Sequence, residues 1–223
     1  CFMDWSPSTR SDPPTGVSRL TESPETVDAR RFADLWCDSS QPAPDLLVVL
    51  ASTRTAEQQG ISAAGCTPSA RRTTALADAE LLLRGPSVPP VWSLPPLPAG
   101  VSPALISWVV CQELGLDPQV AALGLTVPQH FPHLRFEDPR CGPGECVSSG
   151  AAMSTERVLQ LVQRGRRLGQ RLRRPLVLAE CVPGGTTTAL AVLTGLGLPV
   201  QTLVSGSALH PPMELKQRLV SEG

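Results

Sequence analysis

The stretch LVLAECVPGGTTT, residues 176–188, decides the fold class of this chain. Residues 176–179 form a continuous apolar run, which is typical of a strand buried on both faces of a parallel sheet. The tight loop 180–185 contains two adjacent glycines, and the threonines that follow predict the start of a helix over 186–196. A strand that turns directly into a helix is the repeating unit of an α/β domain.

Similar strand signals lie on both sides of this stretch. Apolar runs at 46–51, 120–125 and 200–204 predict further buried strands, whereas 130–149 is rich in Pro and Gly and is predicted to be loop. The predicted helices cover about 67–83, 102–115, 154–174 and the segment from about 212 onward. We therefore predict an α/β, Rossmann-like fold with a mostly parallel sheet flanked by helices.

The first 44 residues differ from the rest of the chain. Residues 1–44 are rich in Ser, Pro, Asp and Thr, and only a short helix over 27–35 is predicted among them. We expect 1–44 to be a partly disordered N-terminal arm and 45–223 to be the α/β domain. Ligands of such domains bind at the carboxyl ends of the strands, so the loops that follow the strands are the places to search.

Composition excludes several classes of protein. The chain has 223 residues, 41% apolar and 17% charged, with a formal net charge of −1, so it is neither a charge-rich disordered chain nor a uniformly basic nucleic-acid binder. No apolar run reaches the length of a membrane span and no signal pattern opens the chain, so we expect a cytoplasmic protein without a membrane partner. The seven cysteines suggest reduced, mostly buried thiols.

The first candidate site follows the strand 176–179. Gly184 and Gly185 let backbone N–H groups approach an anion, and the helix start at Thr186 and Thr187 adds positive potential and hydroxyl donors. Glu180 ends the strand, where a functional carboxylate would project into the crevice. The alternative is a simple glycine turn with threonine caps and a surface acid. No Gly-Lys-Ser/Thr follows, so this is not a Walker P-loop.

The second candidate site follows the predicted strand 200–204. Ser205, Gly206 and Ser207 form a small-residue loop, and Lys216 stands in the next helix. Lys216 is the only lysine beside 18 arginines, and arginine cannot reproduce a compact ammonium group. The alternative is a solvated lysine on the helix surface.

The remaining candidates are weaker. The loop 53–67 contains Ser62, Gly65 and Thr67, whose small side chains leave room for a flat ligand, although an ordinary loop fits equally well. His130 and His133 have no third ligand of the right type nearby, so we expect no metal site. The arginines of 164–174 lie opposite an apolar stripe and have no aromatic partners, which favours a solvated helix face over a nucleic-acid partner.

Several strings together resemble one enzyme family. They are VLASTRTAE at 49–57, GISAAG at 60–65, FPHLR at 131–135, ECVPGGTTTALAVL at 180–193 and LVSGS at 203–207. The family is the archaeal and cyanobacterial branch of the nicotinate-nucleotide–dimethylbenzimidazole phosphoribosyltransferases. The likeness covers residues from about 45 to 223, and the glycine–threonine string is its most specific part.

The resemblance implies a reaction and a set of roles. The family transfers phosphoribose from nicotinate mononucleotide to dimethylbenzimidazole, which gives nicotinate and the α-ribazole phosphate of the cobalamin lower ligand. It implies small-molecule substrates, no cofactor and a homodimer. Glu180 would be the catalytic carboxylate. The implied phosphate- and nucleotide-binding residues are Gly184, Gly185, Thr186, Thr187, Ser205, Gly206, Ser207 and Lys216. The implied base-pocket residues are Ser62, Gly65 and Thr67.

The chain also departs from the family pattern. Family members continue beyond the region matched, and the glutamate that acts as their general base lies in that continuation. We therefore predict an α/β nucleotide-binding domain that is incomplete at its C-terminus. Whether it is an enzyme stays open, and the alternative is a catalytically silent nucleotide-binding module or a fragment of such an enzyme.

Overall fold

The computed structural model describes residues 43–94, 102–125, 129–206, 208 and 210–223. Its strands are β1 (Asp45–Ala51), β2 (Pro118–Leu123), β3 (Leu134–Arg135) and β4 (Leu176–Cys181). Its α-helices are α2 (Pro68–Arg84), α3 (Pro103–Leu114), α4 (Thr155–Gly169), α5 (Gly185–Gly195) and α6 (Met213–Glu222). Short 3-10 helices are η1 (Arg54–Glu57), η2 (Pro139–Cys141) and η3 (Val147–Ser149).

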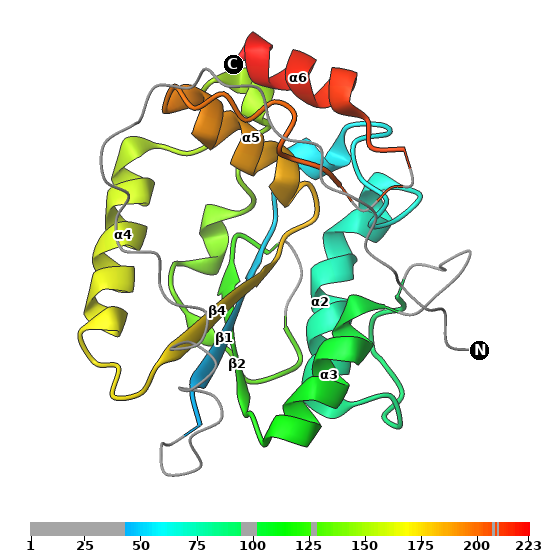
Figure 1. Ribbon diagram of the computed structural model, residues 1–223, viewed down its shortest axis with the longest axis vertical. Coiled ribbons are helices and arrows are strands. Elements are labelled where there is room, and N and C mark those ends of the chain that lie inside the picture. The colour runs from blue at the N-terminus through cyan, green and yellow to red at the C-terminus, as the bar shows by residue number, and fades with distance from the viewer. Residues whose placement is uncertain (1–42, 95–101, 126–128, 207, 209) are drawn as a thin grey trace, which may run out of the picture. The chain divides into compact units, whose positions relative to one another are not determined.

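The strands form one parallel sheet in the order β3-β2-β1-β4. β1 is central and pairs in parallel with β2 and with β4, so that Val48 lies between Val120 and Ala179. Figure 1 shows α2 and α3 on one face of the sheet and α4 on the other, while α5 and α6 lie at the end where β1 and β4 finish. The predicted α/β fold with a parallel sheet flanked by helices is confirmed.

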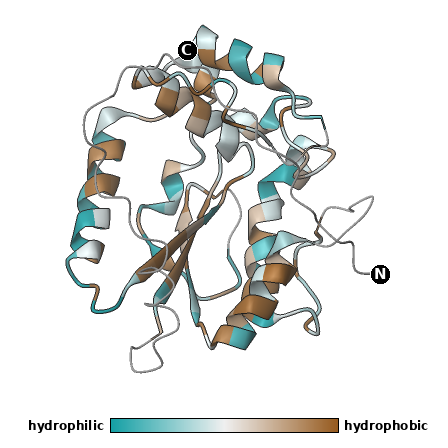
Figure 2. Ribbon diagram, viewed as in Figure 1, coloured by the Kyte–Doolittle hydropathy of each residue, from teal (hydrophilic) through white to brown (hydrophobic). Residues whose placement is uncertain are grey.

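The hydrophobic core lies between the sheet and α2. Alternate β1 residues, Leu46, Val48 and Leu50, belong to it, because successive strand side chains point to opposite faces. Leu76 of α2 is fully buried against this face. Figure 2 shows the apolar colouring of the strands and of α3. This core fixes the direction of the strands and therefore the position of the loops at their carboxyl ends.

Helix starts occur close to the predicted positions. Thr67 caps α2 by accepting a hydrogen bond from the Ala70 N–H at 3.2 Å, and Ser102 caps α3 by accepting one from Ala104 at 3.1 Å. Ser154 accepts one from Arg157 at 3.2 Å at the start of α4. Gly115 ends α3 with φ 62°, a left-handed conformation that glycine adopts without strain.

Two predicted elements are wrong. Residues 200–204 form turns rather than a strand, with the Leu203 N–H bonded to the Val200 carbonyl and Leu203 77% exposed. A strand needs a neighbour to accept its backbone hydrogen bonds, and no described strand pairs with this segment. The second error concerns residues 134–135, which were predicted to be loop and instead form β3. A strand of this length is too short to leave a periodic signal in the sequence.

Some predictions fall on residues outside the described part. The arm from residue 1 to 42, with the predicted helix 27–35, lies there, as does Ser207. Of the five cysteines described as free thiols, only Cys111 is buried, whereas Cys66 and Cys141 are exposed, so the expectation of mostly buried thiols is wrong for these two. No helix among the described residues is both long and apolar enough to span a membrane.

Candidate functional site

The loop between β4 and α5 is held in a conformation that requires glycine. Gly184 has φ 76°, and a Cβ atom there would lie 3.2 Å from the Ala56 backbone nitrogen. Such close approach leaves no room for a side chain, so Gly184 seats the start of α5 directly against η1. The first N–H groups of α5 have no partner inside the helix, and the helix dipole makes this end positive.

Lys216 lies beneath this helix start. It is 1% exposed, and its Nζ donates hydrogen bonds to Thr186 Oγ1 at 2.8 Å and to the Ser205 carbonyl. Burial lowers the pKa of the ammonium group. Among the described residues, Lys216 has no carboxylate partner within ion-pair distance. A buried cation without a counter-ion favours an anion nearby.

The geometry defines how Lys216 and Thr186 act together. Because Thr186 Oγ1 accepts a hydrogen from Lys216, its own O–H is directed elsewhere and can donate to a ligand. Thr186 is exposed and lines a cavity, whereas Lys216 lies behind it. Of the two residues, Thr186 thus has its side chain at the cavity, and Lys216 donates a hydrogen bond to it from behind.

The Ser205–Gly206 segment completes the enclosure of Lys216. A Cβ atom on Gly206 would lie 3.0 Å from Lys216 Nζ, which is closer than a side chain normally approaches. Position 206 therefore needs a glycine if the Lys216 ammonium group is to stay where it is. The predicted association of the 205–206 loop with Lys216 is thus present in the structure, although the loop follows turns rather than a strand.

Glu180 occupies the end of β4 beside the start of α5. Its Oε2 lies 3.4 Å from the position that a Cβ atom on Gly185 would take. Its side chain is solvent-accessible, yet the surrounding atoms partly desolvate the carboxyl group and raise its pKa, against the opposing effect of a hydrogen bond from the Val182 N–H. A carboxylate placed here can stabilise positive charge that develops on a ligand.

A cavity of about 320 Å³, the carboxyl-end cavity, joins these parts. Its walls come from the loop 61–64, one side of α2, Pro103 at the start of α3, the stretch 180–186 and the segment around Gly206. Segments more than 100 residues apart in sequence, such as Ser62 and Glu180, thus share one space. This agrees with the expectation that ligands of open α/β sheets bind at the carboxyl ends of the strands.

The three predicted base-pocket residues do not all reach this cavity. Ser62 lines it, whereas Gly65 and Thr67 do not. Thr67 is the N-cap of α2, and the Gly65 carbonyl accepts a hydrogen bond from Arg71 Nη1 at 2.8 Å. Arg71 is itself buried and also bonds the carbonyl of Ala56, so it fastens the whole loop to α2.

The predicted phosphate-binding threonines also divide. Thr186 lines the carboxyl-end cavity, but Thr187 is fully buried and does not line it. The Oγ1 atoms of Thr187 and Thr188 have no hydrogen-bond partner among the described residues. Thr187 and Thr188 thus follow directly after Thr186, but neither lines the carboxyl-end cavity.

Sequence reasoning missed Asp78 in α2. This side chain lines the same cavity, between Thr74 and the end of β4. It accepts hydrogen bonds from the Ser102 hydroxyl at 2.8 Å and from the Cys181 thiol at 3.5 Å, and burial raises its pKa. A signal was present, since Asp78 stands on the face of α2 that carries Ala75 and Leu82, where an acid is unusual.

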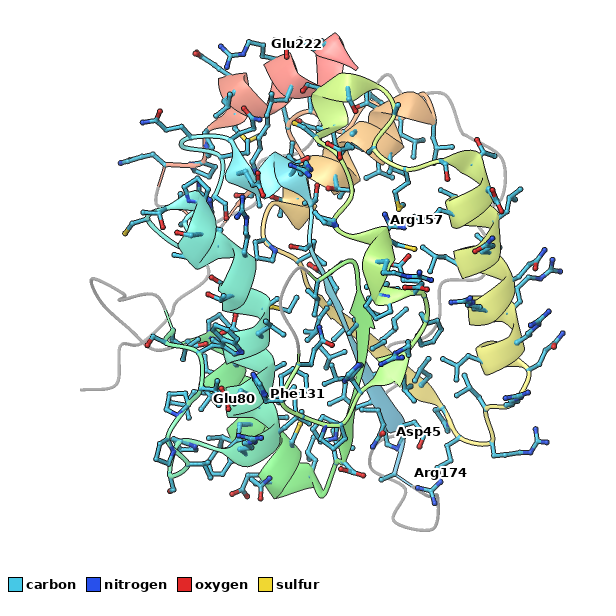
Figure 3. All side chains as sticks on the ribbon, turned by 180° about the vertical axis from the view of Figure 1, so that it is seen from behind. Asp45, Glu80, Phe131, Arg157, Arg174 and Glu222 are labelled. Atoms are coloured by element: carbon cyan, nitrogen blue, oxygen red, sulfur yellow. The ribbon has the colours of Figure 1, made fainter. Side chains whose placement is uncertain are left out.

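Other candidates have structural roles. His130 stacks on Trp92, and His133 Nδ1 lies 3.0 Å from the Phe131 carbonyl. In the part of the chain that the structure describes, no group of three or more metal-binding side chains is found. A larger cavity of about 460 Å³ lies beside α4, where Figure 3 labels Arg157. The buried Glu137 and the half-buried Arg157 in its wall form an ion pair with each other at 2.7 Å.

Known proteins resemble this chain in sequence and in fold. No family model matches the chain. It is 62% identical over 188 residues to a UPF0284 protein from Parasynechococcus marenigrum (strain WH8102), covering 84% of this chain and 48% of that protein. It is 66% identical over 178 residues to a UPF0284 protein from Prochlorococcus marinus (strain MIT 9313), covering 80% and 44%. The chain thus spans about half the length of the curated relatives it matches.

Two solved structures share the fold of this chain. CobT from Thermus thermophilus superposes with a TM-score of 0.54 at 18% identity, over 82% of this chain and 50% of that one. The nicotinate-nucleotide–dimethylbenzimidazole phosphoribosyltransferase from the same organism gives 0.55 at 19% identity, over 82% and 48%. The resemblance predicted from the sequence motifs is therefore confirmed at the level of the fold.

Proposed function

We propose that the chain binds the phosphate of a nucleotide at the start of α5, as part of a transfer of phosphoribose from nicotinate mononucleotide to dimethylbenzimidazole. The observation that carries the proposal is buried Lys216, bonded to Thr186 at the positive end of α5. Backbone N–H groups of the helix start, the Thr186 hydroxyl and the nearby ammonium charge form an environment suited to a dianion. The shared fold with CobT supports the choice of ligand.

The proposed reaction assigns a role to each group. The bond between the nicotinate nitrogen and the ribose anomeric carbon breaks, and its electron pair goes to the nitrogen. A benzimidazole nitrogen forms the new bond, and the ring N–H proton must pass to a base. Glu180 would stabilise the positive charge that develops on the ribose. The phosphate contacts at α5 would hold the sugar in position for attack.

A second candidate is a module that binds the nucleotide without turnover. The chain spans about half the length of its curated relatives, which is consistent with either function. A single experiment separates the two: the chain is mixed with nicotinate mononucleotide, with and without dimethylbenzimidazole, and binding and nicotinate release are both measured. Nicotinate release that depends on dimethylbenzimidazole supports the transferase, whereas nucleotide binding without nicotinate release supports the silent module.

The location of the phosphate is tested by Gly185→Asp. The new side chain would begin 3.2 Å from Val182 Cβ and 3.4 Å from Glu180 Oε2, and it would place a negative charge at the helix start. We expect nicotinate mononucleotide binding to be lost. Unchanged binding would contradict the assignment of the phosphate to α5. The homodimer implied by the resemblance and the cytoplasmic location expected from the sequence composition stay predictions.

A further inference from the structure

A single arginine of α2 fastens the loop that forms one wall of the carboxyl-end cavity. Arg71 is only 5% exposed, and its guanidinium group donates hydrogen bonds to the carbonyl of Ala56 and, at 2.8 Å, to that of Gly65. Longer contacts of 3.4 and 3.5 Å reach two further carbonyls of the same loop. The planar fork of arginine holds several acceptors at once, in a geometry that lysine does not offer. Both ends of the loop 56–65 are thus attached to one side chain.

The loop that Arg71 fastens supports the site in two places. Its residues 61–64 line the carboxyl-end cavity. Its first part, in η1, meets the start of α5, because a Cβ atom on Gly184 would lie 3.2 Å from the Ala56 nitrogen. In Figure 1, η1 lies in cyan between the start of α2 and α5. Arg71 therefore supports the cavity wall directly and the loop before α5 through η1.

No carboxylate neutralises the charge of Arg71. Among the described residues, no acid forms an ion pair with it, whereas the neighbouring and exposed Arg72 pairs with Glu57 at 2.9 Å. Carbonyl oxygens satisfy the donors of a guanidinium group but leave its net charge in place. A buried cation without a counter-ion costs folding free energy, and a neutral donor would bind carbonyls without that cost. The charge itself therefore needs an explanation.

The guanidinium group of Arg71 lies close enough to the start of α5 to act on an anion there. Arg71 Nε bonds the Ala56 carbonyl, and the Ala56 nitrogen lies next to Gly184. Because these two Ala56 atoms belong to one residue, the guanidinium group is within about 11 Å of the Gly184 Cα atom. At an effective dielectric constant of about 20, and after screening by salt, a unit charge at that separation changes the affinity for an anion by about 3- to 10-fold.

We propose that Arg71 is a positioning residue for the nucleotide phosphate, which it attracts through its charge without touching it while it holds the loop 56–65 in place. The inference rests on the proposed function and deepens it, because it adds a second buried cation to the phosphate site. Lys216 acts from beneath the start of α5, and Arg71 acts from behind η1. The site thus favours a phosphorylated ligand over the same ligand without its phosphate.

Two substitutions at position 71 separate the charge from the hydrogen bonds. Arg71→Lys and Arg71→Gln both lose the guanidinium fork, but only the lysine keeps the charge. Calorimetry on the whole chain compares the binding of nicotinate mononucleotide with that of nicotinate riboside, which lacks the phosphate. Both variants should bind both ligands more weakly, because the loop is held less firmly. The preference for the nucleotide over the riboside should stay within about twofold of wild type in Arg71→Lys and fall about 3- to 10-fold in Arg71→Gln.

The neighbouring arginine provides the control. Arg72→Met removes an exposed, ion-paired cation one residue away, so both affinities should remain as in wild type. Equal losses for the two ligands in Arg71→Gln would mean that Arg71 only supports the fold, and would overturn the inference alone. If thermal unfolding shows that Arg71→Gln does not fold, a loss of preference above about twofold in Arg71→Lys would overturn it. A wild-type chain that binds neither ligand would overturn the proposed function as well.

Discussion

Replacing Lys216 with Met should weaken nucleotide binding while leaving the fold intact. Two hydrogen bonds in series, from Lys216 Nζ to Thr186 at 2.8 Å and from Thr186 to the phosphate, put the two charges about 5–6 Å apart. At an effective dielectric constant of about 20, unit charges at that separation attract by about 3 kcal/mol. Screening lowers this, so we expect a loss of about 1.5–3 kcal/mol, or about 10- to 100-fold in affinity.

Thermal unfolding with nicotinate mononucleotide measures the effect. At 100 times the wild-type Kd, the nucleotide should stabilise the wild-type chain by about 2.7 kcal/mol, which raises Tm by about 5–11 °C for a domain of this size. In Lys216→Met the same concentration should give only about 0.4–1.4 kcal/mol. Arg218→Met, at an exposed position in the same helix, should keep the full shift. A full Tm shift in Lys216→Met would show that the Lys216 ammonium group does not contribute to nucleotide binding.

Three further predictions follow from the geometry. Gly206→Val should displace the ammonium group of Lys216, whose Nζ lies 3.0 Å from the new Cβ, and weaken nucleotide binding about tenfold in calorimetry, whereas Gly195→Ala, in open space, should not. Arg71→Met removes the donors that hold the carbonyls of Ala56 and Gly65 and should lower the free energy of unfolding by about 2–4 kcal/mol in urea; a loss below about 0.5 kcal/mol would contradict this role. Asp78→Asn should stabilise the chain at neutral pH. Burial raises the pKa of Asp78, so the folded wild-type chain holds the carboxyl proton more firmly than the unfolded chain does. The free energy of unfolding of the wild-type chain therefore falls as pH rises from the ordinary pKa of the carboxyl group through its pKa in the folded state. Denaturation from pH 4 to 8 should show this advantage growing with pH, and a constant difference would exclude it.

Local patterns in the sequence predict those features that local physics determines. The strands β1 and β4 and the caps at Thr67 and Ser102 could be identified because strand propensity and helix capping depend on neighbouring residues. The predicted burial of 176–179 is wrong, however, because β4 lies at the edge of the described sheet and Leu178 is 65% exposed. Residues 200–204 have the same apolar character, yet they form turns because no described strand pairs with them. Strand formation there depends on partners that the segment's own composition does not specify.

The candidate site shows the same division. The glycine loop before α5 and the pairing of Lys216 with Thr186 agree with the sequence motifs. The burial of Lys216 behind Thr186 and the approach of Asp78 to Cys181, 103 residues later, arise from tertiary packing alone. The Gly65 carbonyl accepts a hydrogen bond from Arg71, and Thr67 caps α2. Both residues therefore stabilise the conformation of the loop and do not line the cavity.

The arginines that follow α4 provide the contrast needed to locate a bound nucleotide. Figure 3 shows Arg174 near Asp45, at the opposite end of the molecule from Glu222 of α6. Phosphate bound by those arginines would therefore perturb a different set of residues from phosphate bound at α5.

NMR titration with nicotinate mononucleotide shows whether the phosphate binds at the start of α5. If the phosphate binds at the start of α5, the backbone amides of Gly184, Gly185 and Thr186 and the Lys216 side chain should show saturable shifts. Saturable shifts confined to the arginines of 164–174, or no shift at all at the start of α5, would contradict it.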